Sequence, residues 1–469
     1  MSEDSIILHE KYGINGDTLY YKKGSNTIVC QKCNFSFQKL FLSVLNFFKQ
    51  IVLPHGYPTS VSEDYLEYQL WDTVQAFCST ITNAFTTRAI LKGMGVGNAE
   101  ATALSATVAW ILKDGTGMIG RILFAWWKGC DLDFDCKKWR FMADIINDMA
   151  MAIEIFIPIY FEYSMQILCV TSVLKSIVGV AGGATRASIT HHQAIKENMA
   201  EISAIDGNQE TLVNLVASML SIFLLSVFDN RSMELVFIFA LMSVHLLANY
   251  KAVKSIVFKK FNKQRLVILL KSYYNLGVIL NPKPVNNMET VILGFGLNDV
   301  QFCGFEIKMG QSVKEMSKSY IPEELSQHLL NFEDKPYFIL PNVKSGTIHV
   351  CFEKVESTKE IIEAYFYASL LAIAICWYYE TDVDVIPKRY LHQTTPMSRL
   401  NTLMRSYERP PNDLYNIPIS FHSTFRQFIN SELKMFFTVL DLKEWDLKSS
   451  EICVGDYRTQ WKMYLKKNV

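Results

Sequence analysis

Long apolar runs between about residues 72 and 250 are the strongest pattern in the chain. Residues 213–228 and 235–250 each contain 16 residues without a formal charge, and the polar segment 229–234 separates them. The pattern predicts two apolar helices joined as a hairpin. A membrane-spanning helix needs about 20 residues, with a range of roughly 17–25, so a buried hairpin in a soluble fold is the alternative.

Helical periodicity extends to several neighbouring segments. Residues 38–53 form an amphipathic pattern that suits either a membrane interface or docking on the rest of the fold, and Pro54 ends it before a turn. Further predicted helices cover residues 60–92, 98–112 and 138–176, the last with a break at Pro158. Residues 1–37 are expected to be irregular.

The pattern changes near residue 287, where short alternating segments replace the long apolar runs. Strands are predicted at 291–295, 302–309, 337–340 and 347–352, with helices near 357–379 and 420–440 and a loop over 380–419. Residues 361–379 are apolar enough to compete as a membrane span, but the strand-rich surroundings favour a buried core helix. The predicted fold class is mainly α. A helical, multi-spanning membrane core over residues 38–286 precedes a C-terminal α+β domain over residues 287–469.

Charge and cysteine content narrow the class of protein. The chain of 469 residues carries 46 basic and 46 acidic residues, which gives no basic footprint for nucleic acid. The ten cysteines are scattered and several lie within apolar runs, which indicates free thiols in a reducing compartment. The acidic N-terminus does not resemble a signal peptide, so we expect an intracellular membrane location rather than secretion.

Basic residues follow the second apolar run without any acidic residue between positions 251 and 271. Such a segment marks the cytoplasmic side of a membrane and attracts anionic lipids, and an ordinary solvated helix face is the alternative. The predicted membrane-surface residues are Lys251, Lys254, Lys259 and Lys260.

A glycine-rich stretch at 179–186 is the main candidate for chemistry. Small residues expose backbone N–H groups, a following helix start offers a positive dipole end, and Arg186 can grip an anion. A phosphate or a small phosphorylated ligand suits that site, whereas close helix packing explains the same residues without a ligand. The candidate anion site comprises Gly179, Gly182, Gly183, Thr185, Arg186 and Gln193. No bound cofactor is predicted.

Charged and polar residues beside the apolar helices form a second candidate, a polar or ion path. Two Asp-Gly pairs follow Gly-Val segments in a similar order, as in a duplicated transporter half, although ordinary turns explain them more simply. Asp144 and Asp148 share one helix face with Arg140, which suits either an ion path or a salt-bridge ladder. The path residues are Asp114, Arg121, Arg140, Asp144, Asp148, Asp206, Gln209 and Glu210.

Metal binding is not predicted. His191 and His192 are adjacent and point about 100° apart on a helix, so they do not share one site. Cys30 and Cys33 form a lone pair without further ligands at zinc-finger spacing. No nucleophile–base pair is evident, so the interpretation leans away from an enzyme.

Eight motifs spread over residues 52–300 resemble the root UVB-sensitive (RUS) family. They are PHGYPTSV at 54–61, YLEYQLWDTVQAFC at 65–78, TRAILKGMGVG at 87–97, WILKDGTGMIGRILFAWW at 110–127, KWRFMADIIND at 138–148, IVGVAGGATRASITHHQ at 177–193, NMAEISAIDGNQETLVNL at 198–215 and HLLANYKAV at 245–253. One departure is Ile205, where relatives usually carry Lys before the second Asp-Gly pair. If that cation binds a ligand in relatives, this chain has lost it.

The resemblance implies a eukaryotic family with predicted membrane segments and no established enzymatic activity. In plants the family is linked to root UV-B sensitivity, vitamin B6 homeostasis and auxin transport, and its members act in pairs. Three functional hypotheses follow. The first is transport or handling of a small polar metabolite in a membrane. The second is a membrane adaptor that pairs with a paralogue or itself and recruits a partner through its C-terminal domain. The third is a soluble or peripheral enzyme with an unfamiliar site that uses Asp114, Arg121, Arg186 and Asp206.

Overall fold

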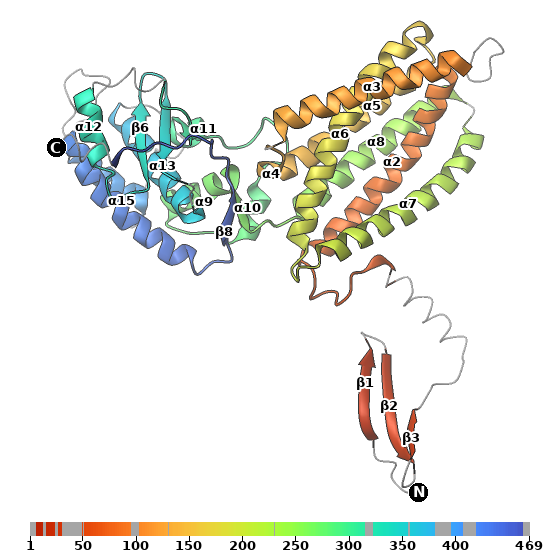
Figure 1. The fold of residues 1–469 in the computed structure, drawn as a ribbon, viewed down its shortest axis with the longest axis horizontal. Helices are drawn as coiled ribbons and strands as arrows, with labels where there is room; N and C mark the ends of the chain where they lie inside the picture. The colour runs from red at the N-terminus through yellow and green to blue at the C-terminus, as the bar shows by residue number, and fades with distance from the viewer. Residues whose placement is uncertain are drawn as a thin grey trace. The chain divides into compact units, whose positions relative to one another are not determined.

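Long α-helices make up most of the chain, as the computed structural model shows in Figure 1. The structure describes residues 6–12, 16–23, 27–30, 49, 51–94, 103–129, 131–228, 230–314, 322–354, 357–379, 395–406 and 419–462. Small sheets accompany the helices in the C-terminal region, so the predicted mainly α class is confirmed. Of the amphipathic helix predicted over residues 38–53, only 49 and 51–53 belong to the described part.

The elements follow one another in a simple order. From the N-terminus they are β1 (Ile6–Tyr12), β2 (Gly16–Lys23), β3 (Thr27–Cys30), α2 (Tyr65–Gly93), α3 (Ala103–Lys128), α4 (Asp131–Phe134), α5 (Cys136–Ile155), the 3₁₀ turn η1 (Phe161–Tyr163), α6 (Ser164–Gln193), α7 (Met199–Val227) and α8 (Arg231–Ser255). The C-terminal region contains β4 (Lys260–Asn262), α9 (Lys263–Leu276), α10 (Pro282–Met288), α11 (Asp299–Cys303), β5 (Glu306–Met309), α12 (Pro322–Leu330), β6 (Tyr337–Asn342), β7 (Thr347–Phe352), α13 (Thr358–Tyr378), α14 (Pro396–Arg405), α15 (Ile419–Leu440) and β8 (Asp446–Glu451).

The chain divides into two compact units, which are described separately. Unit 1 comprises Met1–Arg88 and Ile189–Ala248, and unit 2 comprises Ala89–Ser188 and Asn249–Val469. Each unit therefore combines segments that are far apart in sequence. The three-part division predicted from composition stays a prediction.

Four helical segments are long and apolar enough to cross a membrane in the described part of the chain. They are Phe161–Gln193, Met199–Val227, Arg231–Ser255 and Thr358–Tyr378. The predicted hairpin corresponds to α7 and α8, and both helices extend well beyond the charge-free runs, so length no longer argues against spanning. Only 28%, 11% and 33% of the apolar window is buried in the first three segments, against 83% in the fourth.

Helix α13 is the central element of the C-terminal core. Ser357 caps its first turn and Glu360 completes the capping box. The helix is apolar on all sides, which is typical of a helix buried in a protein core. It packs with the three-stranded sheet β5-β7-β6 and with helices α9, α11, α14 and α15. Its burial supports the interpretation of residues 361–379 as a core helix rather than a membrane span.

The N-terminal segment differs from the expectation of irregular structure. Strands β1, β2 and β3 form an antiparallel sheet in sequence order. Apolar and polar residues alternate in parts of these strands, and glycines lie at or near the boundaries between them. Alternation flanked by glycine is a hairpin signal, although the overall polarity of the segment favours irregular structure.

Several C-terminal boundaries also differ. Residues 291–295 contain no strand, and the segment predicted as one strand over 302–309 divides into the end of α11 and β5. Asn298 explains the division, because its side chain caps α11 in a capping box with Gln301. The loop predicted over 380–419 contains α14, whose start at Pro396 is capped by Thr395. Strand β7 and helices α13 and α15 match their predicted ranges closely.

The glycine-containing motifs lie inside continuous helices, contrary to the prediction of turns and helix starts. Asp114-Gly115 lies within α3, Asp206-Gly207 within α7, and Gly179–Gly183 in the second half of α6. Glycine in a helix costs only about 1 kcal/mol relative to alanine, which long helices with extensive contacts can tolerate. The ideas of Asp-Gly turns, of interrupted transporter helices and of a helix start beside Arg186 are therefore wrong.

Candidate functional site

The glycine stretch of α6 faces two arginine side chains in unit 2. A Cβ atom placed on Gly179 would lie 3.9 Å from a terminal nitrogen of Arg121, which belongs to α3. A Cβ on Gly182 would lie 4.0 Å from a terminal nitrogen of Arg140, which belongs to α5. The two glycines are three positions apart and so lie on one helix face. Two guanidinium groups therefore end beside a strip of α6 that has no side chains.

Other residues of the predicted anion site are distributed around α6. Thr185 is buried, and its hydroxyl donates to the backbone oxygens of Ala181 and Gly182, at 2.7 and 3.2 Å. Gly183 is exposed and Arg186 is half-buried one turn further along the helix. Gln193 is buried near the end of α6, in the part that belongs to unit 1. The backbone N–H groups of Gly179–Gly183 lie within the helix, so the anion-site prediction now rests on side chains.

Helix α5 carries the buried acidic part of the predicted polar path. Asp144 and Asp148 are both buried, and Asn249 of α8 donates a hydrogen bond to Asp144. Further along α5, Glu154 is fully buried and accepts from the Lys175 ammonium of α6 at 2.5 Å. In contrast, the Asp114 side chain of α3 is 62% exposed and lies 3.9 Å from the Lys113 ammonium.

The remaining path residues belong to unit 1, where α2 and α7 share polar contacts. Gln69 donates to Asp206 at 3.2 Å, and Gln209 donates to the Tyr65 hydroxyl at 3.4 Å and to the Val52 carbonyl. Glu210 is exposed.

Further polar contacts join α2 to α7 and to α8. The Thr80 hydroxyl donates to Asn214 at 2.6 Å, and Arg88 bonds the Glu234 carboxylate at 2.7 Å and the Leu225 carbonyl at 3.1 Å. Figure 1 shows α2, α7 and α8 as long helices. Polar groups on such apolar helices are stabilised when they bond one another.

Some lysines of the predicted membrane surface contact other parts of the protein. Lys254 donates to the carbonyl oxygens of Asn287 and Glu289, at 2.8 and 2.7 Å. Lys259 is exposed and lies 3.8 Å from Glu444, and Lys251 is also exposed. Lys260 is half-buried within β4. The basic segment thus contains the last turn of α8 and β4 rather than one exposed helix face.

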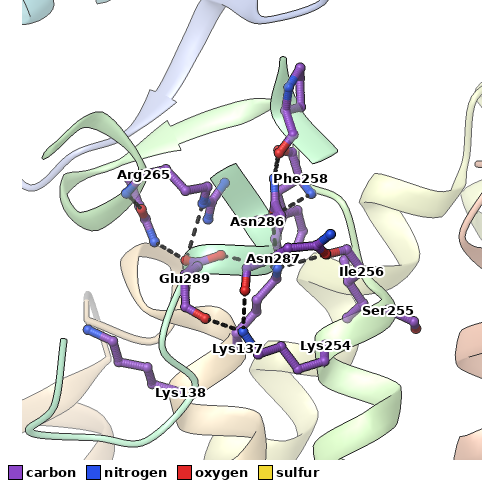
Figure 2. Close-up of polar contacts among 12 residues, drawn as sticks. Lys137, Lys138, Lys254, Ser255, Ile256, Phe258, Arg265, Asn286, Asn287 and Glu289 are labelled. Carbon is purple, nitrogen blue, oxygen red and sulfur yellow. Dashed lines mark hydrogen bonds and ion pairs between the residues drawn. The ribbon is translucent and has the colours of Figure 1, made fainter. Parts of the chain in front are cut away.

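Four charged residues of unit 2 form a buried ion cluster, made of Lys137, Arg265, Glu289 and Glu451. Figure 2 shows Lys137, Arg265 and Glu289. The Lys137 ammonium of α5 lies 3.1 Å from Glu289, and it donates to Asn286 at 2.8 Å and to the Ile256 carbonyl at 2.7 Å. The ammonium thus combines one ion pair with two hydrogen bonds.

The Arg265 guanidinium joins the cluster from α9. It lies 3.2 Å from Glu289 and 3.1 Å from Glu451, and it also donates to the Lys260 carbonyl. Asn262 donates to Glu289 at 2.8 Å. Two cations and two carboxylates balance one another, which buried charges require.

Burial and charge oppose each other at Glu289. Burial alone raises the pKa of this carboxyl group, but the neighbouring Arg265 and Lys137 outweigh that effect and lower the pKa to about 2. Burial lowers the pKa of Lys137, while Glu289 acts in the opposite direction and favours the ammonium form. The cluster joins the start of α5 to α9, to the end of α10 and to β8.

Sequence reasoning missed this cluster. The absence of acidic residues between 251 and 271 suggested a lipid-facing segment, but the carboxylates that pair with Arg265 lie 24 and 186 residues further along the chain. A usable signal was present, because Arg265 is followed directly by the apolar residues Leu266–Leu270. An arginine at the start of a buried helix requires a buried acid.

The two adjacent histidines have different surroundings. His192 lies 2.9 Å from the Asp64 carboxylate in unit 1, whereas His191 is exposed. Cys33 lies outside the described residues. Within the described ranges, no group of three or more His, Cys, Asp or Glu side chains could hold a metal ion.

Fold and polar networks together define a helix-rich protein with three long, mostly unburied apolar helices and a C-terminal α+β region. Two family profiles match it. The Vitamin B6 photo-protection and homoeostasis domain covers residues 38–277, and the Root UVB sensitive protein, C-terminal, region covers residues 278–461. The chain belongs to the root UVB sensitive family, which confirms the resemblance drawn from the motifs.

Named relatives are found in two organisms. The chain is 42% identical over 287 residues to RUS family member 1 of Dictyostelium discoideum, covering 59% of this chain and 54% of that protein. It is 31% identical over 376 residues to Protein root UVB sensitive 3 of Arabidopsis thaliana, covering 78% and 84%. Protein root UVB sensitive 2, chloroplastic, of the same plant is 28% identical over 311 residues, covering 66% and 69%. No solved structure matches the chain.

Proposed function

We propose that this protein is embedded in an intracellular membrane and transports, or organises the handling of, a small anionic metabolite. The observation that carries the proposal is the exposure of large apolar side chains along α7 and α8. Ile222 and Val236 are 73% and 72% exposed, and only 11% and 33% of the apolar windows of α7 and α8 are buried. A lipid environment stabilises such surfaces, whereas water does not.

The polar residues of unit 2 support a small-molecule role. Arg121 and Arg140 end beside Gly179 and Gly182 of α6, which places two positive charges near the same strip of that helix. A guanidinium group binds carboxylate or phosphate oxygens in a bidentate manner. The description of the matching domain names vitamin B6, and its phosphorylated form carries such an anionic group.

Uptake by reconstituted protein tests the proposal. Full-length protein in liposomes is incubated with labelled pyridoxal 5′-phosphate or pyridoxine, and the accumulated label is measured. We expect uptake of the phosphorylated form, and Arg121→Ala should reduce it at least about tenfold, the effect of losing about 1.4 kcal/mol of binding. The matched control is Arg405→Ala, at an exposed arginine in the last turn of α14.

Two outcomes contradict the transport reading. If correctly inserted protein takes up no label, the transport hypothesis is wrong. If wild type and Arg121→Ala take up the label equally, the hypothesis of an arginine binding site is wrong. Insertion is checked in the same vesicles by protease protection, so a failure to insert is not mistaken for loss of transport.

An adaptor that pairs with itself or a paralogue is the second candidate. It is favoured by the separate core around α13, which can present a folded surface to a partner. Deletion of the C-terminal region is a poor test, because it would remove Glu289 and leave Lys137 buried without a carboxylate. Two differently tagged full-length copies should instead co-purify from detergent if self-pairing occurs, and a strictly monomeric mass contradicts self-pairing.

An enzyme is the third reading. Of the residues proposed for such a site, Asp114, Arg121 and Arg186 belong to unit 2, and Asp206 belongs to unit 1, where it accepts from Gln69.

A further inference from the structure

Helix α3 packs against α6 through one face that contains small residues. A Cβ atom on Gly117 would lie 2.6 Å from the Ser172 hydroxyl oxygen and 2.8 Å from that of Ser176. A Cβ on Gly120 would lie 3.0 Å from a side-chain carbon of Val173. The Ser172 hydroxyl also donates to the Lys113 carbonyl at 2.7 Å. These contacts fix which side of α3 faces the protein.

The other side of α3 is apolar and exposed. Its large apolar side chains are between 42% and 84% exposed, and they are Val108, Trp110, Ile111, Leu112, Met118, Ile119, Ile122, Leu123, Trp126 and Trp127. Such a contiguous surface on one helix marks an interaction site rather than ordinary solvent exposure.

Tryptophans bound this surface at both ends. Trp110 and Trp127 are 17 positions apart, which corresponds to a rise of about 26 Å along an α-helix. The hydrocarbon core of a bilayer is about 30 Å thick, and tryptophan is enriched where hydrocarbon meets the headgroups on both sides. The distance between the tryptophans therefore suits a bilayer.

Basic side chains accompany the tryptophans. The Lys113 ammonium lies 4.2 Å from the centre of the Trp110 ring, and the Lys128 ammonium lies 4.9 Å from that of Trp127. Lysines near the ends of membrane helices extend towards the headgroup region, where anionic lipids attract them. Each lysine also lies near an acid, with Asp114 3.9 Å from Lys113 and Asp131 2.7 Å from Lys128, so both ends of α3 present the charged groups that a headgroup layer accommodates.

Charged residues of α3 lie near one end of the apolar surface or beside α6. The Arg121 guanidinium reaches the Gly179 position of α6, and Asp114 lies 3.9 Å from Lys113, one turn from Trp110. Composition alone does not select α3 as a membrane helix, because these three charges interrupt its apolar sequence. Lys113 and Asp114 lie within one turn of Trp110, near the proposed headgroup level, whereas Arg121 is exposed and its guanidinium lies beside the glycine face of α6.

We infer that α3 spans the lipid bilayer, with the acyl chains covering the face that contains Met118, Ile122 and Trp126. This inference rests on the proposed membrane insertion of α7 and α8 and adds a span that their apolar runs do not imply. It also places Arg121 and the glycine face of α6 at membrane depth.

Cysteine accessibility tests the inference in full-length protein reconstituted in liposomes. Met118→Cys and Ile122→Cys probe α3, Ile222→Cys probes α7, and Leu442→Cys, at a position 81% exposed in the C-terminal region, is the aqueous control. A membrane-impermeant maleimide is added, and labelling above that of the unsubstituted chain is measured. Vesicles are opened by freeze–thaw so that both aqueous sides are reached.

We expect labelling at positions 118, 122 and 222 to be at least about tenfold slower than at 442. Protection at 222 with rapid labelling at 118 and 122 would overturn the α3 span while leaving the membrane proposal intact. Rapid labelling at all four positions would overturn both. Oxidative cross-linking of Met118→Cys is also measured in a large excess of lipid over protein, where chance encounters between chains are rare. Efficient formation of dimers would show that a second copy covers this face, and this result would also overturn the inference.

Discussion

Replacing Lys137 with Met should destabilise the C-terminal region more than any change to an exposed ion pair. The Lys137 side chain is only 1% exposed, and its ammonium contacts Glu289, Asn286 and the Ile256 carbonyl. Methionine has a similar length and fills the same space, so the packing changes little. The substitution removes the positive charge and two hydrogen-bond donations.

The size of the effect follows from the charge left behind. Removing one partner of a buried ion pair typically costs about 3–5 kcal/mol, because the remaining charge is buried without full compensation. Arg265 stays beside Glu289 and limits the loss, which favours the lower part of that range. For a cooperative unit of this size, each kcal/mol lowers the melting temperature by about 2–4 °C, so we expect a decrease of roughly 6–12 °C.

Thermal unfolding of the purified full-length protein in detergent measures this effect. The matched control is Lys359→Met, because Lys359 pairs with Asp441 at 3.3 Å while both side chains are about half exposed. Exposed pairs contribute only about 0–1 kcal/mol. Lys137→Met should therefore lower the melting temperature several times more than Lys359→Met. Equal shifts for the two variants would refute the reasoning that the buried cluster holds this region together.

Three further predictions concern the same contacts. Because the pKa of Glu289 is lowered to about 2, its ionised form stabilises the fold above about pH 4.5, and this contribution is lost as the pH falls towards 2. Glu289→Gln should accordingly make the melting temperature less dependent on pH between 4.5 and 2, and an unchanged dependence would contradict the assignment. Gly117→Ala should cost about 1–3 kcal/mol by crowding α6, whereas Gly115→Ala, with no atom within 4 Å of the new Cβ, should be neutral or stabilising by up to about 1 kcal/mol in the same thermal assay. Arg88→Met should lower the melting temperature more than Arg231→Met, because both contact the same carboxylate but Arg88 is more buried and its contact is shorter, and the reverse order would contradict this account.

The helical part of the fold could be predicted in its main features because its signals are local. Apolar runs identify α7 and α8, and Pro158 lies in the break between α5 and α6, as expected. Helix continuity through Gly115, Gly182 and Gly207 could not be predicted from residue type. Neighbouring helices and long hydrogen-bonded segments outweigh the small local cost of glycine.

The candidate site could be predicted only in part, since it depends on contacts between distant segments. The sequence identified Arg121, Arg140 and the α6 glycines as separate candidates, and the structure brings them together on one helix face. The apolar residues after Arg265 indicate that this arginine needs a buried acid, but the sequence does not identify Glu289 and Glu451 as its partners. Such pairing depends on the tertiary fold, and a charge run without local acids therefore suggested a membrane surface.

Alkaline carbonate extraction of membranes from cells that express the full-length chain tests the central claim most directly. Carbonate releases proteins that are held at a membrane surface by charge, whereas proteins with spanning helices stay in the pellet. We predict that the protein stays in the membrane pellet, together with a known integral membrane marker. Complete release into the supernatant would contradict membrane insertion of α7 and α8, and the exposed apolar faces would then require a protein partner.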